Sequence, residues 1–439
     1  MAIVARQLER EALAIARSLG LPSFQYVVTS RILTDLPATE VEEEIDQVLG
    51  QILEKLTTTP ESNSSRVQTK AGPAQAERFS GEDRYDCFSR MNEAFLERGW
   101  GDGFPLLPPT REAVASMLQG TSRTLDEVVA VMAPGDGMAS VERIAINAVM
   151  AGCRAEHLPV LLAAVEAMTT PPFPLRTVAC GTSPHAPLAV VNGPLAKRVG
   201  IHSGRCALGP GAPSRVNTAI GRALRLVMMN VGHAYPDVAD LDTIGSPLKY
   251  GMCLAENEEA NPWEPYHVER GFPREASTVT VFGIKDMVDM NDVQNETAEG
   301  LLTSYSAWSA LMGGEYMELT KDFSEYHGIV LLAPDSARVI AHDGWSKKSI
   351  REYLYHHSRL PLKWLLSKIR AMGPQVMLPQ YRWLLDAPQE MLFPVIGSPE
   401  WYHIVVAGGS VGKSQYMRLM GPASMTRPIE DIPRKNERA

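Results

Sequence analysis

The stretch from residue 186 to residue 255 decides the fold. It opens with the apolar run APLAVVN (186–192), passes through the glycine-rich GPGAPS (209–214) into RVNTAIGRALRLVMMN (215–230), and closes with KYGMCLA (249–255). The first and last runs have the composition of buried strands, whereas the third begins after a serine suited to capping a helix. Strand, helix and strand in succession indicate a mixed α/β fold.

The same alternation continues on both sides of this stretch, and residues 81–430 are predicted to form the main catalytic-type domain, either as one unit or as two subdomains. Three more strands are predicted, at 277–283, 328–333 and 402–407. Three more helices are predicted, at 110–120, 140–151 and 158–168, the first two with Thr110 and Ser140 as N-caps.

The N-terminal region reads as a separate, small segment. An amphipathic helix is predicted over residues 4–19, a strand over 24–28 and a second amphipathic helix over 40–57. One strand cannot form a sheet alone, so this segment needs strands from elsewhere. Residues 58–80, rich in Thr, Ser, Pro, Ala and Gln, are predicted to be a linker.

Composition excludes several classes of protein. The chain has 439 residues, 45% hydrophobic and 21% charged, with a net charge of −9 and no basic stripe, which argues against nucleic-acid binding. No run approaches the roughly 18 apolar residues of a membrane span, and the N-terminus lacks the features of a signal peptide, so we expect a cytoplasmic protein. Five widely spaced cysteines predict neither a disulfide framework nor a C-x-x-C zinc site.

Two glycine-rich loops are candidate anion sites. The loop at 209–214 runs into a helix whose N-terminus suits an anion, and Arg215 and Arg222 lie seven residues apart on one face of that helix. The alternative is a turn with a capped helix whose arginines bind neighbouring carboxylates. The second loop, AGGSVGKS (407–414), satisfies a relaxed phosphate-loop pattern.

Too little chain follows that second loop for a nucleotide-hydrolysing domain, because only 25 residues remain after Ser414. We expect instead that Gly408, Gly409, Lys413 and Ser414 bind a smaller anion or the backbone of a substrate. The alternative is a tight turn without function.

An acidic loop, residues 255–271, is the candidate catalytic segment. Glu256, Glu258 and His267 are predicted to provide acid–base chemistry, and they are the expected ligands if a divalent metal is bound. The alternative is a network of caps and salt bridges around a turn. Cys206, close to a helix start, and Cys180 are candidate nucleophiles, although a lone cysteine is more often a small buried hydrophobe.

Several motifs together resemble a bacterial family that is found with, or fused to, the UGSC domain, which is named for its selenocysteine- or cysteine-containing motif. The resemblance covers most of residues 85–420. The motifs that carry it are 191–194, 200–204, 207–211, 220–226, 255–272, 343–347 and the 408–413 loop.

The resemblance also extends to the N-terminal region. Residues 1–57 look like the C-terminal part of the UGSC domain, but the U/C-G-S-C motif is absent. The resemblance therefore implies a partner chain that carries the missing half, and so an oligomer. It implies no particular reaction.

We therefore expect an enzyme or enzyme subunit that acts on a small anionic organic or sulfur-containing substrate through thiol and acid–base chemistry, as an oxidoreductase or a lyase. Asn192, His202 and Asn217 are further candidates for binding that substrate. The alternatives are a metal-dependent hydrolase or lyase, and a non-catalytic partner subunit of a UGSC-type redox protein.

Overall fold

The structure is a computed structural model, and it describes residues 1–9, 12, 13, 16, 24–33, 36–57, 77–313, 319 and 326–432. Most of the predicted linker, from residue 58 to residue 76, lies outside the described residues, as does Gly20, the predicted end of the first helix. Among the described residues, no helix combines the length and the apolar composition that a membrane crossing needs.

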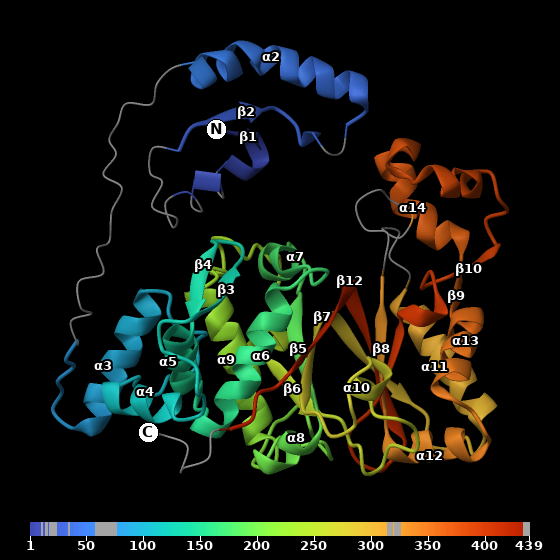
Figure 1. Ribbon diagram of the computed structural model, residues 1–439. Helices are drawn as coiled ribbons and strands as arrows, with labels where there is room; N and C mark the ends of the chain where they lie inside the picture. The colour runs from blue at the N-terminus through green and yellow to red at the C-terminus, as the bar shows by residue number, and fades with distance from the viewer. Residues whose placement is uncertain are drawn as a thin grey trace.

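A six-stranded mixed sheet forms the centre of the main body, which confirms the predicted α/β class (Figure 1). Its strands are β5 (Ala186–Asn192), β6 (Met252–Ala255), β7 (Thr278–Asn291), β8 (Gly328–Leu332), β11 (Tyr402–Val406) and β12 (Lys413–Pro428). Their order across the sheet is β11-β8-β12-β7-β5-β6. The pairs β5–β6 and β8–β11 are parallel, and the other neighbours are antiparallel.

The sheet consists of two halves that have the same topology. In one half, α9 (Arg215–Asn230) connects β5 to the parallel strand β6, and β7 then returns beside β5. In the other, α12 (Pro334–His342) and α13 (Lys347–His357) connect β8 to β11, and β12 returns beside β8. The long strands β7 and β12 join the halves at the centre. The sequence shows no repeat that predicts this arrangement.

The sheet is strongly curled, so that its edges approach each other: the Asn257 amide after β6 donates to the Val406 carbonyl of β11 at 2.8 Å, although the edge strands β6 and β11 do not pair in the described residues. All six strands contribute side chains to a single apolar cluster inside the curl, among them Leu188, Leu254, Phe282, Leu331, Val405 and Met417. The sheet is therefore a barrel with an apolar interior.

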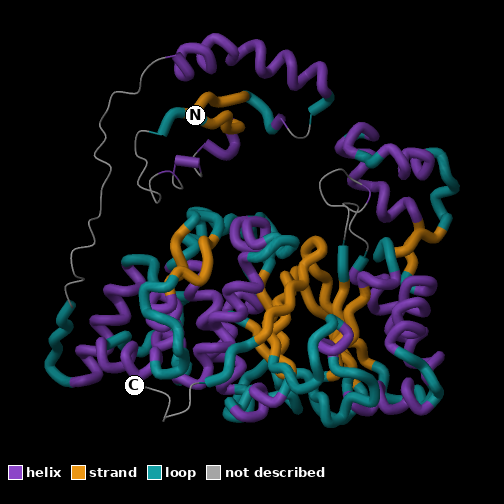
Figure 2. The backbone as a smooth tube through the Cα atoms, viewed as in Figure 1, coloured by secondary structure: helices purple, strands orange, loops and turns teal. Residues whose placement is uncertain are grey.

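Helices cover the outside of the barrel on two opposite sides, as Figures 1 and 2 show. The helices α5 (Val141–Ala151), α6 (Leu158–Thr169) and α9 pack on the half built from β5, β6 and β7. The helices α11 (Ala298–Met312), α12 and α13 pack on the half built from β8 and β11. These layers leave the two mouths of the barrel to the loops.

Smaller elements surround this core. They are α3 (Arg84–Glu97), α4 (Arg111–Leu118), the hairpin β3 (Val128–Met132) and β4 (Gly137–Ser140), α7 (Leu175–Cys180), α8 (Pro194–Arg198) and α10 (Tyr266–Glu269). The predicted N-caps Thr110 and Ser140 are confirmed, since their side chains accept from the amides of Ala113 and Arg143. A lobe of β9 (Arg359–Pro361), α14 (Leu362–Met372) and β10 (Leu392–Pro394) has an apolar cluster of its own.

The N-terminal unit contains β1 (Ala2–Ala5), β2 (Tyr26–Thr29) and α2 (Ala38–Thr57), and it is drawn apart from the main body (Figure 1). The predicted helix over residues 4–19 is wrong at its start, because Val4 pairs with Val28 in a two-stranded parallel sheet. Strand pairing here overrides the helical spacing of the apolar residues.

Two differences in the main body have local causes. The strand predicted at 249–255 begins only at Met252, because Pro247–Tyr250 form a 3₁₀ turn. The long strand β12 was not predicted, since Gly421 and Pro422 interrupt its sequence. The structure accommodates them in a register shift between Leu419 and Ser424.

Candidate functional site

A cavity of about 450 Å³ opens at the mouth of the barrel where β6, β8 and β11 end and β12 begins. This volume lies within the range of small-molecule sites. The floor is apolar, and two loops and the start of β12 form the walls. The lining consists of Arg205, Cys206, Ala207, Leu208, Gly209, Leu254, Leu331, Ala407, Gly408, Gly409, Ser410, Val411, Lys413 and Gln415.

The first wall is the loop that carries Cys206, and Asn217 of α9 holds it in place. The buried Asn217 side chain accepts from the His202 amide at 2.8 Å and donates to the carbonyls of His202 and Ala207 at 2.7 and 2.9 Å. The His202 ring in turn bonds the Arg205 carbonyl through Nε2 at 2.8 Å. The loop is thus fixed from the helix behind it.

Cys206 itself is exposed and has a φ of +56°, in the left-handed region that favours glycine. A non-glycine residue persists there only when its surroundings impose the conformation, and such residues concentrate at functional sites. Here the bonds made by Asn217 on either side of Cys206 impose it. The exposed thiol is therefore presented by a rigid loop.

The second wall is the glycine-rich loop after β11. The Gly408 amide donates to the Ser203 carbonyl at 2.8 Å, and Arg205 donates from its guanidinium to the Ser410 carbonyl at 2.8 Å. A Cβ atom on Gly409 would lie 2.1 Å from Cγ of Arg205, so glycine lets the two walls approach. Within the part of the chain that the structure describes, the amides of Gly409, Ser410 and Val411 donate to no acceptor. They are available to a ligand.

The charge of the lining is positive. Arg205 and Lys413 contribute two cations, and none of the lining residues, all of which the structure describes, is acidic. Cationic side chains together with unpaired amides attract an anion. The apolar floor, with Leu254 and Leu331, suits a short carbon skeleton.

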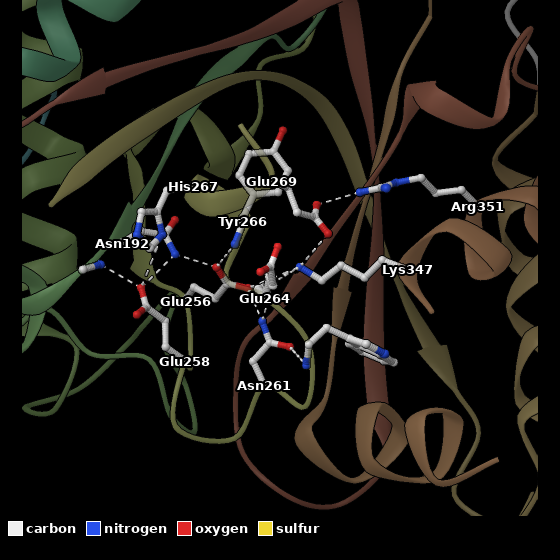
Figure 3. A network of polar contacts seen from close by, with 12 residues as sticks. Asn192, Glu256, Glu258, Asn261, Glu264, Tyr266, His267, Glu269, Lys347 and Arg351 are labelled. Carbon is white, nitrogen blue, oxygen red and sulfur yellow. Dashed lines mark hydrogen bonds and ion pairs between the residues drawn. The ribbon is translucent and has the colours of Figure 1, made fainter. Parts of the chain in front are cut away.

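The acidic loop folds into a buried polar network beside this cavity, which Figure 3 shows. The carboxylate of Glu256 accepts from Asn192 Nδ2 at 2.5 Å, from the Tyr266 amide at 2.7 Å and from Asn261 Nδ2 at 2.9 Å. Burial raises the pKa of Glu256, and the Lys347 ammonium at 3.9 Å opposes that shift. Every oxygen of this carboxylate thus has an internal donor.

Glu258 and His267 complete the network. Glu258 accepts from Asn192 Nδ2 at 2.9 Å and from the Gly193 amide at 2.7 Å, and its Oε1 lies 3.9 Å from Nδ1 of the fully buried His267. The other ring nitrogen of His267 is 3.3 Å from the Arg274 carbonyl. Asn192, Glu256, Glu258 and His267 therefore lie close together, although their polar groups mostly serve one another.

The network supports the cavity through Asn257. The amide of Asn257 bonds the Val406 carbonyl at 2.8 Å, and its side chain donates to the Gly408 carbonyl at 3.3 Å. The Ala255 amide also donates to the His202 carbonyl at 3.3 Å. The acidic loop thus positions both walls without lining the cavity itself.

Four predicted site residues lie elsewhere. Arg222 makes a two-pronged ion pair with Asp102 at 2.6 and 2.8 Å, which is the alternative considered for the arginines. Arg215 is exposed and does not line the cavity. The Arg215/Arg222 anion pocket is therefore not formed, because a carboxylate distant in the sequence occupies Arg222.

Cys180 and Ser414 also lie outside the cavity. The Cys180 thiol donates to the Arg176 carbonyl at 2.7 Å, and burial raises its pKa. Ser414 is buried on the outer face of β12, where its hydroxyl accepts from the Ala333 amide at 3.0 Å. Strand geometry explains this placement, because neighbouring residues of a strand face opposite sides, and Lys413 faces the cavity.

The geometry gives no support to a metal site. In the described ranges, no group of three or more His, Cys, Asp or Glu side chains is arranged to hold a metal ion, and this includes Glu256, Glu258 and His267. Carboxylates that already accept from amides and side-chain amides have few lone pairs left for a cation.

Sequence reasoning missed Arg205, Ser410, Val411 and Asn257. Of these, Arg205 could have been identified from the sequence, since it directly precedes Cys206 and a cation beside a cysteine is a recognised feature of reactive thiols. The contacts made by Asn257 join segments that are about 150 residues apart, and no local signal shows them.

In comparisons with known proteins, no family model matches this chain, and no curated protein or solved structure is significantly similar to it. Function is therefore inferred from the geometry of the site.

Proposed function

We propose that this protein is an enzyme that binds a small organic anion in the Cys206 cavity and attacks it with the Cys206 thiol. One observation carries the proposal: the exposed, conformationally strained Cys206 shares a cavity of about 450 Å³ with Arg205 and Lys413. Structural cysteines are small buried hydrophobes, as Cys253 is. Cys206 has the opposite surroundings.

The parts of the cavity have separate roles in this proposal. Lys413 and the amides of Gly409, Ser410 and Val411 bind the anionic group of the substrate, a carboxylate or a sulfur oxyanion. The Cys206 thiol loses its proton to water, and the thiolate adds to a carbonyl carbon of the bound molecule: the S–C bond forms, the C=O π bond breaks and its electron pair moves to the carbonyl oxygen. Amides that are fixed before the reaction stabilise the negative charge that develops there. This combination favours a thiol-dependent lyase.

The proposal is tested with two alkylating reagents of nearly equal size, anionic iodoacetate and neutral iodoacetamide. Labelling is followed for each cysteine by peptide mass spectrometry, with Cys180 as the internal reference. We expect Cys206 to prefer iodoacetate relative to Cys180. We expect Lys413→Gln to slow the iodoacetate reaction roughly fivefold, corresponding to about 1 kcal/mol for one charge near water, and to leave the iodoacetamide reaction unchanged.

Lys348→Gln is the matched control, since Lys348 is exposed and lies outside the Cys206 cavity. An anion site at this thiol is contradicted if Cys206 and Cys180 show the same ratio of iodoacetate to iodoacetamide labelling. It is also contradicted if Lys413→Gln and Lys348→Gln slow the iodoacetate labelling of Cys206 equally.

A second role, as one subunit of a complex with a UGSC-type chain, is favoured by the N-terminal unit. The described part of this unit holds a two-stranded sheet and one long helix. Leu49, Leu53 and Leu56 of that helix are 43%, 54% and 64% exposed, and their spacing places them along one stripe. Exposed apolar stripes mark contact surfaces.

Purification from the native source followed by native mass spectrometry tests this role. A complex with a second kind of chain, lost on Leu53→Asp, is the expected result. A homogeneous single-chain species contradicts it.

A further inference from the structure

A second cavity, of about 880 Å³, lies at the opposite end of β11 from the Cys206 cavity. Its lining includes His403 near the start of β11, whereas Ala407 just past the end of β11 lines the first cavity. The segment after β6 and the N-terminus of α13 form its walls. Figure 3 shows the Glu269 carboxylate of that segment between Lys347 and Arg351 of α13.

Cationic side chains dominate this cavity, with five cations and three carboxylates in the lining. Glu269 is already neutralised, because it lies 3.3 Å from the Lys347 ammonium and 2.7 Å from the Arg351 guanidinium. By contrast, Arg270 and Arg274 pair with no carboxylate among the described residues. Two guanidinium groups in the lining are therefore left for an outside partner.

The remaining charges do not cancel these arginines. Among the described residues, Lys348 pairs with Glu352 at 3.9 Å. The hydrogen bond from Ser398 chiefly lowers the pKa of Glu400, and Arg351 and Lys348 add to that shift. The acids Glu264 and Glu400 are both exposed, and Glu400 accepts from the Ser398 hydroxyl. Arg270, Arg274 and Lys348 are exposed as well, so cations outnumber acids among the exposed groups of the lining.

The helix N-terminus adds donors to the arginines. Ser346 caps α13 with its side chain on the Ser349 amide, and this leaves the amides of Lys347 and Lys348 without an intrahelical acceptor. Both residues line the cavity. Free amides at the positive end of a helix dipole bind anionic oxygens.

The floor contributes polar groups without negative charge. The Tyr266 hydroxyl bonds Nδ1 of the buried His403 at 2.8 Å, and the Arg270 guanidinium lies 5.9 Å from the centre of the Tyr266 ring. Burial keeps the pKa of His403 well below its ordinary value, and Arg270 and Arg351 add to that shift. The imidazole is therefore neutral at physiological pH.

We propose that this cavity is a second anion site, for the phosphate group of a small molecule, bound by Arg270, Arg274 and the first amides of α13. A dianionic phosphate has more terminal oxygens than a carboxylate, and two guanidinium groups with two amides match that number of acceptors. The site is distinct from the Cys206 cavity, and its existence does not depend on thiol chemistry there.

Titration calorimetry of the full chain with inorganic phosphate tests the proposal. The variants are the double substitution Arg270→Gln/Arg274→Gln, Lys413→Gln to identify phosphate bound in the other cavity, and Lys363→Gln as the matched control, because Lys363 lines neither cavity. We expect the double variant to bind phosphate at least tenfold more weakly than the wild type. Lys363→Gln should stay within twofold of the wild type. Circular dichroism shows whether the double variant is folded.

Three outcomes overturn the proposal. They are no detectable binding of phosphate by the folded wild type, equal binding by the wild type and the folded double variant, and loss of binding in Lys413→Gln alone. Should the double variant fail to fold, Arg270→Gln alone provides the same comparison with a smaller expected loss. A citrate titration forms a second arm, and tighter binding of citrate than of phosphate overturns the choice of phosphate.

Discussion

Replacing Asn217 by alanine should release the Cys206 loop from the body of the protein. Asn217 is 1% exposed, and its side chain makes three hydrogen bonds, all to the backbone of His202 and Ala207. Alanine leaves the His202 amide and the Ala207 carbonyl without this partner, whereas the His202 carbonyl keeps the Ala255 amide at 3.3 Å. The strained backbone of Cys206 between these bonds then loses the contacts that impose it.

The magnitude follows from those three bonds. A hydrogen bond contributes about 0.5–1.5 kcal/mol net, and an orphaned buried group costs more. The free energy of opening of this loop should therefore fall by about 2–4 kcal/mol. Since about 1.4 kcal/mol is a factor of ten, amide exchange in the loop should accelerate roughly 30- to 1000-fold.

Hydrogen exchange with mass spectrometry measures this on peptides that cover residues 200–209. Asn230→Ala is the matched control, because Asn230 lies on the same helix and bonds the Trp100 carbonyl and Asn147, away from the loop. We also expect the iodoacetate preference of Cys206 to disappear in Asn217→Ala only. Unchanged exchange over 200–209 in that variant would refute the role assigned to Asn217.

Three further predictions follow from single contacts. Gly409→Ala should displace the Arg205 side chain, because the new Cβ would lie 2.1 Å from its Cγ; we expect slower iodoacetate labelling of the cavity thiol with an unchanged circular dichroism spectrum. Asp102→Asn should lower the free energy of unfolding in urea by about 3 kcal/mol, because it breaks a largely buried pair with Arg222; labelling of the cavity thiol should not change, and a wild-type urea midpoint would contradict the prediction. Burial lowers the pKa of His185 to about 4. Between about pH 6.5 and pH 4 the unfolded state therefore binds a proton that the folded state does not, so the free energy of unfolding falls with pH by up to about 3 kcal/mol. His185→Leu should flatten the plot of melting temperature against pH in this range, and an unchanged slope would count against the prediction.

Local sequence patterns predicted the elements whose boundaries depend on local chemistry. The strand at 186–192 was predicted with the bounds that β5 has, since an apolar run with turn residues at both ends leaves little choice. The N-caps Thr110 and Ser140 were likewise predictable from a single residue type. Strand β12 was not, because its pairing with β7 and β8 tolerates a glycine and a proline that the local pattern counts as breakers.

The site divides in the same way. The glycine-rich loop was found from its composition, and Gly408, Gly409 and Lys413 do line the cavity. Ser414 does not, since a phosphate-loop pattern assumes a helix after the loop, whereas here a strand follows and turns alternate residues away. The prediction that Arg222 binds the substrate was wrong for a different reason. Its partner Asp102 precedes it by 120 residues, and no spacing rule connects the two.

The cavity exists because the two halves of the barrel end differently. In one half, the segment 256–277 follows β6, and its polar side chains fill the space at the strand end with their own network. In the other, only residues 407–412 separate β11 from β12, and glycines replace bulky side chains, so the space stays open. Asn257 joins the two loops at Gly408. The acidic residues, the most conspicuous candidates in the sequence, are thus better understood as the support on which the Cys206 cavity is built.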